Sequence, residues 1–345
     1  MSKPRVFITR LILESGLQLV QDFCEVVPVL AYHPESRTGR GEAEIWSGEL
    51  PPSRAELLRR IPGLDGLLCL LTDRIDAEVM DAAGPGLKVI SNCAVGVDNV
   101  DVPAATARGI PVGNTPGVLT DATADFAFAL LMAAGRRVVE GERQVRSGGW
   151  KTWSLDTLLG ADFAGATLGL VGFGRIGRAV ARRATGFGMR IIFSDPNPAA
   201  PEPGVEAAQV DFDTLLRESD FVSLHTPLTD ETRGLMNAAA FAKMKPTAVL
   251  VNTSRGPVVD QSALYEALKS HHIFAAALDV TVPEPLPTDS PLLELENCII
   301  VPHIASASWQ ARQNMSRMAA ENLIAGLKGE RLPNCVNPEV YEGRK

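Results

Sequence analysis

The sequence lacks any apolar run long enough to cross a membrane. Its longest apolar stretch, Phe126 to Ala134, is far shorter than the about 20 residues that a transmembrane helix needs. The first ten residues, MSKPRVFITR, are polar and then briefly apolar, without the apolar core of a secretory signal peptide. We therefore expect a cytoplasmic protein with no membrane partner.

Cysteine and basic charge are also scarce. The five cysteines are odd in number and form no CxxC pair, which favours small core residues in a reducing compartment. Lys and Arg number 33 against 41 Asp and Glu, and no basic cluster stands out. Such a chain has little of the positive charge that drives binding to phosphate backbones. We predict no nucleic-acid partner and no metal site.

Short runs rich in Val, Ile and Leu alternate with helix-like segments, which is typical of βαβ units and parallel sheets. The chain of 345 residues is also too long for one ordinary core and suits two domains. In its first third we predict helices over 54–61 and 76–83, an exposed loop over 31–53, and strands over 5–9, 25–29, 66–71, 88–92 and 110–113.

A second alternating block starts at Ala166. Its six predicted strands cover 166–171, 190–194, 221–224, 248–252, 274–278 and 298–301. A long helix precedes the block, over 122–146, with Thr120 or Asp121 as its N-cap. The last helix, 308–328, has apolar residues at 3-and-4 spacing, so one of its faces is expected to pack back on the first domain.

These elements predict an α/β protein with two doubly wound parallel-sheet domains. A Rossmann dinucleotide-binding domain is expected over 113–301, because six strands with intervening helices fit that fold. A flavodoxin-like substrate-binding domain, discontinuous in sequence, is expected over 1–112 and 302–345.

Gly172, Gly174 and Gly177 form a GxGxxG pattern that a strand precedes and a helix follows. Such glycines allow a tight turn and the close approach of a pyrophosphate, which the helix N-terminus attracts. Asp195 closes the next strand, where an acidic residue accepts hydrogen bonds from both ribose hydroxyls and repels a 2′-phosphate. We therefore favour NAD(H), with NADP(H) as the alternative. A structural turn in a Rossmann domain that binds no nucleotide is the competing interpretation.

Three late strands run into residues with the side chains that keto-acid reduction needs: Arg255, Glu284 and His303. A His can protonate the oxygen on which charge develops, a carboxylate can orient the imidazole and favour its charged form, and an Arg can hold a substrate carboxylate. Asp279 is expected at the nicotinamide amide. Taken singly, His303 fits a structural role and Arg255 a surface charge, but their placement on successive strand ends favours catalysis.

At these residues the chain resembles the D-isomer-specific 2-hydroxyacid dehydrogenases, and most of all the glyoxylate/hydroxypyruvate reductases. The likeness covers nearly the full length and includes the motifs GLVGFGRIG, VNTSRGPVVDQSAL, AALDVTVPEPLP and VPHIASAS. The resemblance implies that Arg255, Glu284 and His303 are the catalytic trio. It also implies a homodimer built through the long helix and the segment after it.

The resemblance further implies substrate contacts. The N–H groups of Val95 and Gly96 are expected to bind the substrate carboxylate, and Leu71 to line the pocket. Arg255 and His303 would contact the substrate too. Trp153 matches an aromatic that a dimer partner contributes, whereas the sequence alone leaves core packing equally open. The cofactor contacts that we predict are Thr120, Gly172, Gly174, Arg175, Ile176, Gly177, Asp195, Thr226, Pro227, Thr253, Ser254 and Asp279.

The predicted function is the NAD(P)H-dependent reduction of a small 2-keto acid, glyoxylate or hydroxypyruvate, to the D-2-hydroxy acid. Relatives of this family act on D-lactate, 3-phosphoglycerate, formate or phosphite, so these substrates stay open. A phosphorylated substrate would need cations beside Val95, where Arg74 alone is near in the predicted fold. Some relatives are NAD-sensing binding proteins or corepressors, which is the alternative of a different class.

Overall fold

The computed structural model describes residues 3–26, 50–197 and 202–342. The chain separates into two compact units, one made of Met1–Leu119 with Ser308–Lys345 and the other of Thr120–Ala307. None of the described helices combines the length and the apolar composition that a membrane crossing requires. Parts of two predicted elements, the end of the strand over 25–29 and most of the loop over 31–53, lie outside the described residues.

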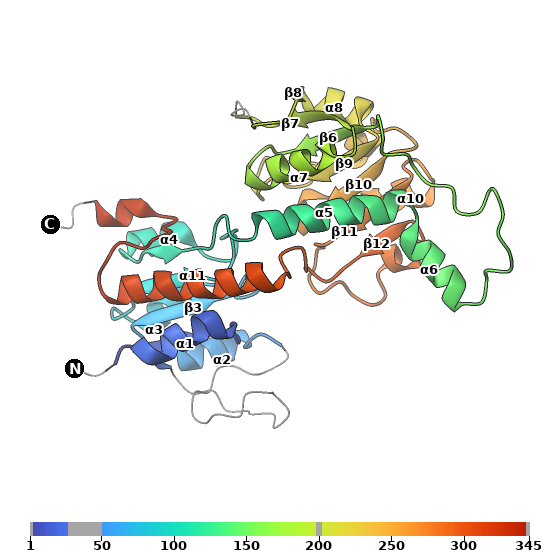
Figure 1. The fold of residues 1–345 in the computed structure, drawn as a ribbon. Coiled ribbons are helices and arrows are strands. Elements are labelled where there is room, and N and C mark those ends of the chain that lie inside the picture. Colours follow the sequence, from blue (N-terminus) through green and yellow to red (C-terminus); the bar gives the residue numbers. More distant parts are fainter. Residues whose placement is uncertain (1–2, 27–49, 198–201, 343–345) are drawn as a thin grey trace. The chain divides into compact units, whose positions relative to one another are not determined.

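Within its described residues, the first unit holds a five-stranded parallel sheet in the order β2-β1-β3-β4-β5, the flavodoxin-like order. The strands are β1 (Arg5–Ile8), β2 (Glu25–Val26), β3 (Gly66–Cys69), β4 (Val89–Asn92) and β5 (Val112–Gly113). The helices are α1 (Glu14–Phe23), α2 (Arg54–Arg60), α3 (Ala77–Ala83), α4 (Val102–Ala107) and α11 (Trp309–Leu327) (Figure 1).

Local chemistry explains where the short helices start. Ser53, Asp76 and Asp101 each accept a hydrogen bond from the backbone N–H three residues ahead, which fixes the first residue of α2, α3 and α4. The central strands β3 and β4 are buried at every residue, as expected of strands covered on both faces.

The C-terminal helix α11 belongs to the first unit, where it packs on β3, β4 and α1. A glycine permits each close contact: a Cβ at Gly16 of α1 would lie 2.1 Å from the Ser316 carbonyl oxygen, and one at Gly326 would lie 2.5 Å from Val89. The hydroxyl of Ser91 donates to the Ala319 carbonyl at 2.7 Å, in the middle of this contact. The first unit is therefore discontinuous in sequence.

Within its described residues, the second unit holds seven parallel strands in the order β12-β11-β10-β9-β6-β7-β8. The strands are β6 (Thr167–Val171), β7 (Arg190–Ser194), β8 (Ala207–Gln209), β9 (Phe221–Leu224), β10 (Val249–Asn252), β11 (Ala275–Leu278) and β12 (Cys298–Ile300). Six of them were predicted. The edge strand β8 was missed because its three residues are only partly buried or exposed and give no apolar pattern.

The helices of the second unit are α5 (Thr120–Gly135), α6 (Val138–Arg146), α7 (Arg175–Thr185), α8 (Phe212–Glu218), α9 (Ala238–Phe241) and α10 (Gln261–Lys269). Single 3-10 turns lie at η1 (Gly256–Val258), η2 (Pro291–Glu294) and, in the first unit, η3 (Pro338–Tyr341). The sequence of strands and helices gives the order of a Rossmann domain extended by one strand.

The prediction of one helix over 122–146 was wrong. The helix breaks at Arg137, whose φ of 53° is left-handed, and the Gly135 carbonyl accepts from the Ala161 N–H at 2.8 Å. Through this bond, the last turn of α5 holds the segment at Ala161. The predicted cap was wrong as well, because Thr120 and Asp121 already lie within the first turn of α5.

The unit boundaries fall a few residues after those predicted. Residues 114–115 stay with the first unit, because Asn114 N–H donates to the Asn334 carbonyl at 3.3 Å and Thr115 N–H to the Ala94 carbonyl at 2.9 Å. Residues 302–307 stay with the second unit, where Asp279 holds the turn that follows β12. Polar contacts of loops, which apolar patterns do not register, set both boundaries.

Candidate cofactor and active site

The glycine-rich loop after β6 has the form that a pyrophosphate site needs. Gly172 has a φ of +90°, and a Cβ there would lie 2.7 Å from the His225 carbonyl oxygen. A Cβ at Gly177 would lie 2.3 Å from the Gly172 carbonyl oxygen, so this glycine lets α7 approach the loop. A Cβ at Gly174 would meet no atom within 4 Å. Gly172 and Gly177 are thus required by the fold, whereas Gly174 faces open space that an anion can enter.

Helix α7 begins at this open position. Gly174 is its N-cap and offers no side chain to the first N–H groups, and the first backbone bond of the helix is from Arg178 to Gly174. The N–H groups of Arg175 and Ile176 precede that bond and belong to the orphan donors of a helix start. Orphan donors together with the positive end of the helix dipole favour an anion here.

Asp195, at the end of β7, lies against the same loop. One carboxylate oxygen accepts from the Phe173 N–H at 2.8 Å and the other from the Asn197 N–H at 2.9 Å. Each oxygen of a carboxylate has a second lone pair, so Asp195 can still accept from ribose hydroxyls. The two residues that follow it, Pro196 and Asn197, carry no positive charge.

The remaining predicted cofactor contacts follow other strands. Thr253, after β10, has a buried hydroxyl for which no partner exists among the described residues. A buried orphan hydroxyl is costly, and a bound nucleotide would supply its partner. Ser254 differs, because its hydroxyl donates to Asn252 at 2.8 Å. After β9, Thr226 and Pro227 make one long contact at 3.4 Å, and Thr120 lies at the start of α5.

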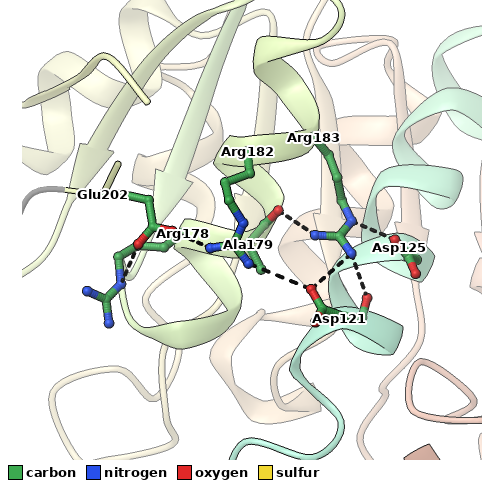
Figure 2. Close-up of polar contacts among 7 residues, drawn as sticks. All are labelled: Asp121, Asp125, Arg178, Ala179, Arg182, Arg183 and Glu202. Carbon is green, nitrogen blue, oxygen red and sulfur yellow. Dashed lines mark hydrogen bonds and ion pairs between the residues drawn. The ribbon is translucent and has the colours of Figure 1, made fainter. Parts of the chain in front are cut away.

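Ion pairs of two arginines near its C-terminal end also hold helix α7 in place. Figure 2 shows the guanidinium of Arg183 against Asp125 at 2.6 Å and Asp121 at 3.2 Å, both on α5. Arg182 pairs with Glu202 and with Asp121. Because Asp121 and Asp125 are exposed, their pairs contribute about 0–1 kcal/mol each and serve chiefly to orient α7 against α5.

The imidazole of His303, after β12, lies beside the carboxylate of Glu284. His303 Nδ1 and Glu284 Oε2 are 3.0 Å apart, and the other oxygen of Glu284 accepts from the Thr281 N–H at 2.9 Å. Burial alone would raise the pKa of Glu284, but the bonds from His303 and Thr281 and the charges of His303 and Arg255 lower it below the ordinary value. Glu284 is therefore an ionised acceptor that holds the ring through Nδ1.

His303 has a strained backbone, with a left-handed φ of 53°. Its N–H donates to the Asp279 carbonyl at 2.9 Å, and the next two N–H groups, of Ile304 and Ala305, donate to the Asp279 carboxylate at 2.6 and 3.0 Å. Burial raises the pKa of Asp279 despite these bonds. Asp279 thus holds the turn that aims His303, a function that the sequence analysis missed. Its predicted contact with the nicotinamide stays a prediction.

Arg255 follows β10 on a turn that Asn252 holds. The Asn252 amide donates to the Arg255 carbonyl at 2.9 Å, and the Arg255 guanidinium donates to the Ser254 carbonyl at 2.9 Å. A Cβ at Gly256 would lie 1.9 Å from the Thr281 carbonyl oxygen, so this turn sits directly on the segment that leads to Glu284. The second unit by itself therefore places the Glu284 carboxylate in contact with the His303 imidazole, and the charge of Arg255 helps to lower the pKa of Glu284.

The other predicted substrate residues lie on separate segments. Leu71 and Val95 follow β3 and β4 of the first unit, and Gly96 is next to Val95. Trp153, after α6, is 76% exposed, so it is not a core residue in this chain. His225, which follows β9, bonds to the Ser223 hydroxyl at 2.9 Å, and burial lowers its pKa to about 3. His225 is thus neutral and structural.

Comparison with known proteins identifies the family of this chain. Residues 128–305 match the family model for the NAD binding domain of D-isomer specific 2-hydroxyacid dehydrogenases. A glyoxylate reductase of Korarchaeum cryptofilum is 53% identical over 99% of this chain and 98% of its own length. One of Thermofilum pendens is 50% identical over 100% and 97%.

Solved structures give the same result. A protein of Thermus thermophilus is 49% identical, with a TM-score of 0.85 over 96% of this chain and 99% of that one. An NADPH-dependent glyoxylate/hydroxypyruvate reductase of Sinorhizobium meliloti, solved with NADP and malonate, is 31% identical, with a TM-score of 0.80 over 100% of both chains. The chain therefore belongs to the D-isomer specific 2-hydroxyacid dehydrogenases, which are nicotinamide-dependent oxidoreductases.

Proposed function

We propose that this protein reduces glyoxylate or hydroxypyruvate to the corresponding 2-hydroxy acid, with the D configuration where the product is chiral. The observation that carries the proposal is the 3.0 Å contact between His303 Nδ1 and Glu284, beside the turn of Arg255, in a unit with a pyrophosphate-type glycine loop. The similarity to curated relatives named glyoxylate reductase supports this choice among 2-keto acids.

The chemistry follows from these groups. When bound, the nicotinamide supplies the hydride. Glu284 accepts from His303 Nδ1, so Nε2 is the atom that carries the transferable proton to the substrate oxygen. Arg255 presents a planar donor pair to the substrate carboxylate and polarises the keto oxygen. His303 is thus the general acid, Glu284 its orienting partner and Arg255 the anchor.

For the cofactor we propose NADH over NADPH. Asp195 places a carboxylate against the glycine loop, where it binds ribose hydroxyls and repels a 2′-phosphate. The Sinorhizobium neighbour is described as NADPH-dependent, so preference for the phosphorylated cofactor does occur at this level of similarity. The two uncharged residues after Asp195 support the preference for NADH in this chain.

On the substrate side, we propose that the first unit supplies Leu71 and the N–H groups of Val95 and Gly96. The second unit would bind the dinucleotide. A small unphosphorylated acid fits, because the loop from Cys93 to Asn99 carries no Lys or Arg.

We also propose a homodimer. The segment after α6 exposes Trp150, Trp153, Leu155 and Leu159 by 59 to 80%, and Figure 1 shows α6 and this segment extending away from the sheet of the second unit. An apolar surface of this kind marks a protein interface. A partner's Trp153 would then complete the substrate pocket, as the resemblance implies.

A panel of substrates and cofactors tests the proposal. NADH oxidation is followed with glyoxylate, hydroxypyruvate, pyruvate and phosphorylated 2-keto acids, and the same panel is repeated with NADPH. The proposal predicts the highest kcat/KM with glyoxylate or hydroxypyruvate and NADH. Turnover with none of the acids, together with tight NADH binding, would favour a non-catalytic NAD-sensing protein instead.

A further inference from the structure

We propose that Asn92 and Asn99 are positioning residues that aim the backbone N–H groups of the loop after β4 at the substrate carboxylate. The inference rests on the proposed function, in which Val95 and Gly96 bind that carboxylate. All the contacts that support it lie within the first unit.

The two asparagines form a reciprocal amide pair. Asn92 Nδ2 donates to Asn99 Oδ1 at 3.0 Å, and Asn99 Nδ2 lies 3.3 Å from Asn92 Oδ1, a longer contact that must share a hydrogen with one of its shorter bonds. Asn92 is completely buried and also donates to the Gly96 carbonyl at 2.9 Å. Asn99 also donates to the Leu70 and Asp73 carbonyls, both at 3.0 Å. Since these three acceptors are backbone carbonyls, the orientation of both amides is fixed by chemistry.

The loop carbonyls are held one after another. The Ala94 carbonyl accepts from the Thr115 N–H at 2.9 Å, the Val95 carbonyl from the Asn114 amide at 2.8 Å, and the Gly96 carbonyl from Asn92. In a trans peptide, the C=O of one residue and the N–H of the next point in opposite directions. Each anchored carbonyl therefore turns one N–H away from its anchor.

The three N–H groups turned away in this manner belong to Val95, Gly96 and Val97. Among the described residues, none of these three donates to an acceptor. Successive unpaired N–H groups form a concavity that binds anions. The amide pair thus does more than satisfy buried polar atoms, because it fixes the direction of the donors that the proposed function uses.

The pair also links this loop to the turn after β3. Leu70 and Asp73, whose carbonyls Asn99 holds, bracket Leu71, the predicted pocket residue. Asp73 is buried and accepts from the Leu70 N–H at 2.8 Å and from the Thr9 hydroxyl. One partly buried network therefore sets both segments that would contact the substrate, and breaking it is expected to displace them together.

Asn99→Asp tests this inference, because it keeps the shape and the acceptor oxygen but removes the donors to Asn92, Leu70 and Asp73. Ser91→Ala is the matched control. It removes a buried 2.7 Å bond from β4, the strand that ends at Asn92, but that bond is to α11 and not to the loop. The readouts are KM and kcat for glyoxylate, the inhibition constant of oxalate, NADH affinity and the melting temperature.

The carboxylate of the substrate keeps its charge throughout the reaction. Weaker contacts from the loop N–H groups should therefore weaken the binding of the ground state and of the transition state alike. Asn99→Asp should raise KM and the oxalate inhibition constant by about tenfold, as loss of a hydrogen bond to a charged group does. The turnover number and NADH affinity should change less than about twofold. Ser91→Ala should lower the melting temperature without changing KM.

Unchanged KM and oxalate binding in folded Asn99→Asp would overturn the inference, as would equal losses in kcat and NADH binding. If Asn99→Asp does not fold, Asn114→Ala releases only the Val95 carbonyl from an exposed amide and should still raise KM. An unchanged KM there would contradict the inference too. A wild-type protein that neither turns over keto acids nor binds oxalate would instead refute the proposed function.

Discussion

At the scale of single residues, the side chains proposed to act on the substrate could be named from the sequence, and those that hold their turns could not. Arg255, Glu284 and His303 follow late strands, and parallel strands end at one edge of a sheet. The sequence analysis did not identify Asn252 and Asp279 as the residues that fix the two turns. Their partners are backbone atoms, which Asn252 contacts within its own turn and Asp279 contacts in the segment after β12. A buried polar residue at a strand end is the signal that would have found both.

Glu284 gives the first prediction, on pH. Its pKa is lowered in the folded protein, so the stability from its contacts is present above the ordinary carboxyl pKa and is lost as the pH falls below it. Glu284→Gln should therefore lower the melting temperature at pH 7 and much less at pH 3. It should also move the alkaline limb of the reduction rate to lower pH, because the charged imidazole loses its partner.

Melting curves and rate profiles between pH 3 and pH 9 would check this prediction. A difference in melting temperature between wild type and Glu284→Gln that grows as the pH falls would contradict the assigned contacts. An alkaline limb that does not move would remove Glu284 as the partner of the imidazole.

Asp195 gives the second prediction, on the cofactor. Asp195→Ala removes the charge that repels a 2′-phosphate, so the ratio of kcat/KM for NADH over NADPH should fall by about tenfold or more. Asp195→Asn keeps the side-chain shape and still offers one acceptor to the Phe173 N–H, which separates the effect of charge from the support of the loop. An unchanged ratio in both variants would end the argument for NADH.

At the scale of elements, apolar patterns found strands well and missed interruptions. Buried parallel strands are continuous apolar runs, so most were predicted to within one or two residues. The break between α5 and α6 was missed although Gly135 lies at it, and the left-handed Arg137 and the bond from Ala161 to the Gly135 carbonyl show why the helix ends.

The glycine loop gives the third prediction, a pair of variants with opposite outcomes. Gly174→Ala puts a methyl into open space, so the melting temperature of the free protein should hardly change while NADH affinity falls by about tenfold or more. Gly177→Ala puts a methyl 2.3 Å from the Gly172 carbonyl oxygen, so the fold itself should lose about 1–3 kcal/mol. Thermal melts with and without NADH would distinguish them. Full NADH affinity in Gly174→Ala would exclude this loop as the pyrophosphate site.

At the scale of the whole molecule, the sequence predicted the family and the two α/β folds, and the homodimer that its resemblance implies stays a prediction. The exposed tryptophans after α6 predict that the protein is a dimer in solution. Sedimentation at micromolar concentration should give twice the mass of the chain, and Trp150→Ser combined with Leu155→Ser should weaken association and raise KM for the keto acid. A monomeric wild type with full activity would contradict this assembly.

The central claim is that His303 supplies the proton for keto-acid reduction, and His303→Ala tests it most directly. The rate of NADH oxidation with saturating glyoxylate is compared in wild type and variant, and NADH binding is measured in both by fluorescence. The account predicts a kcat lower by about 10²-fold or more, with NADH affinity unchanged. Equal turnover by the two proteins would contradict it.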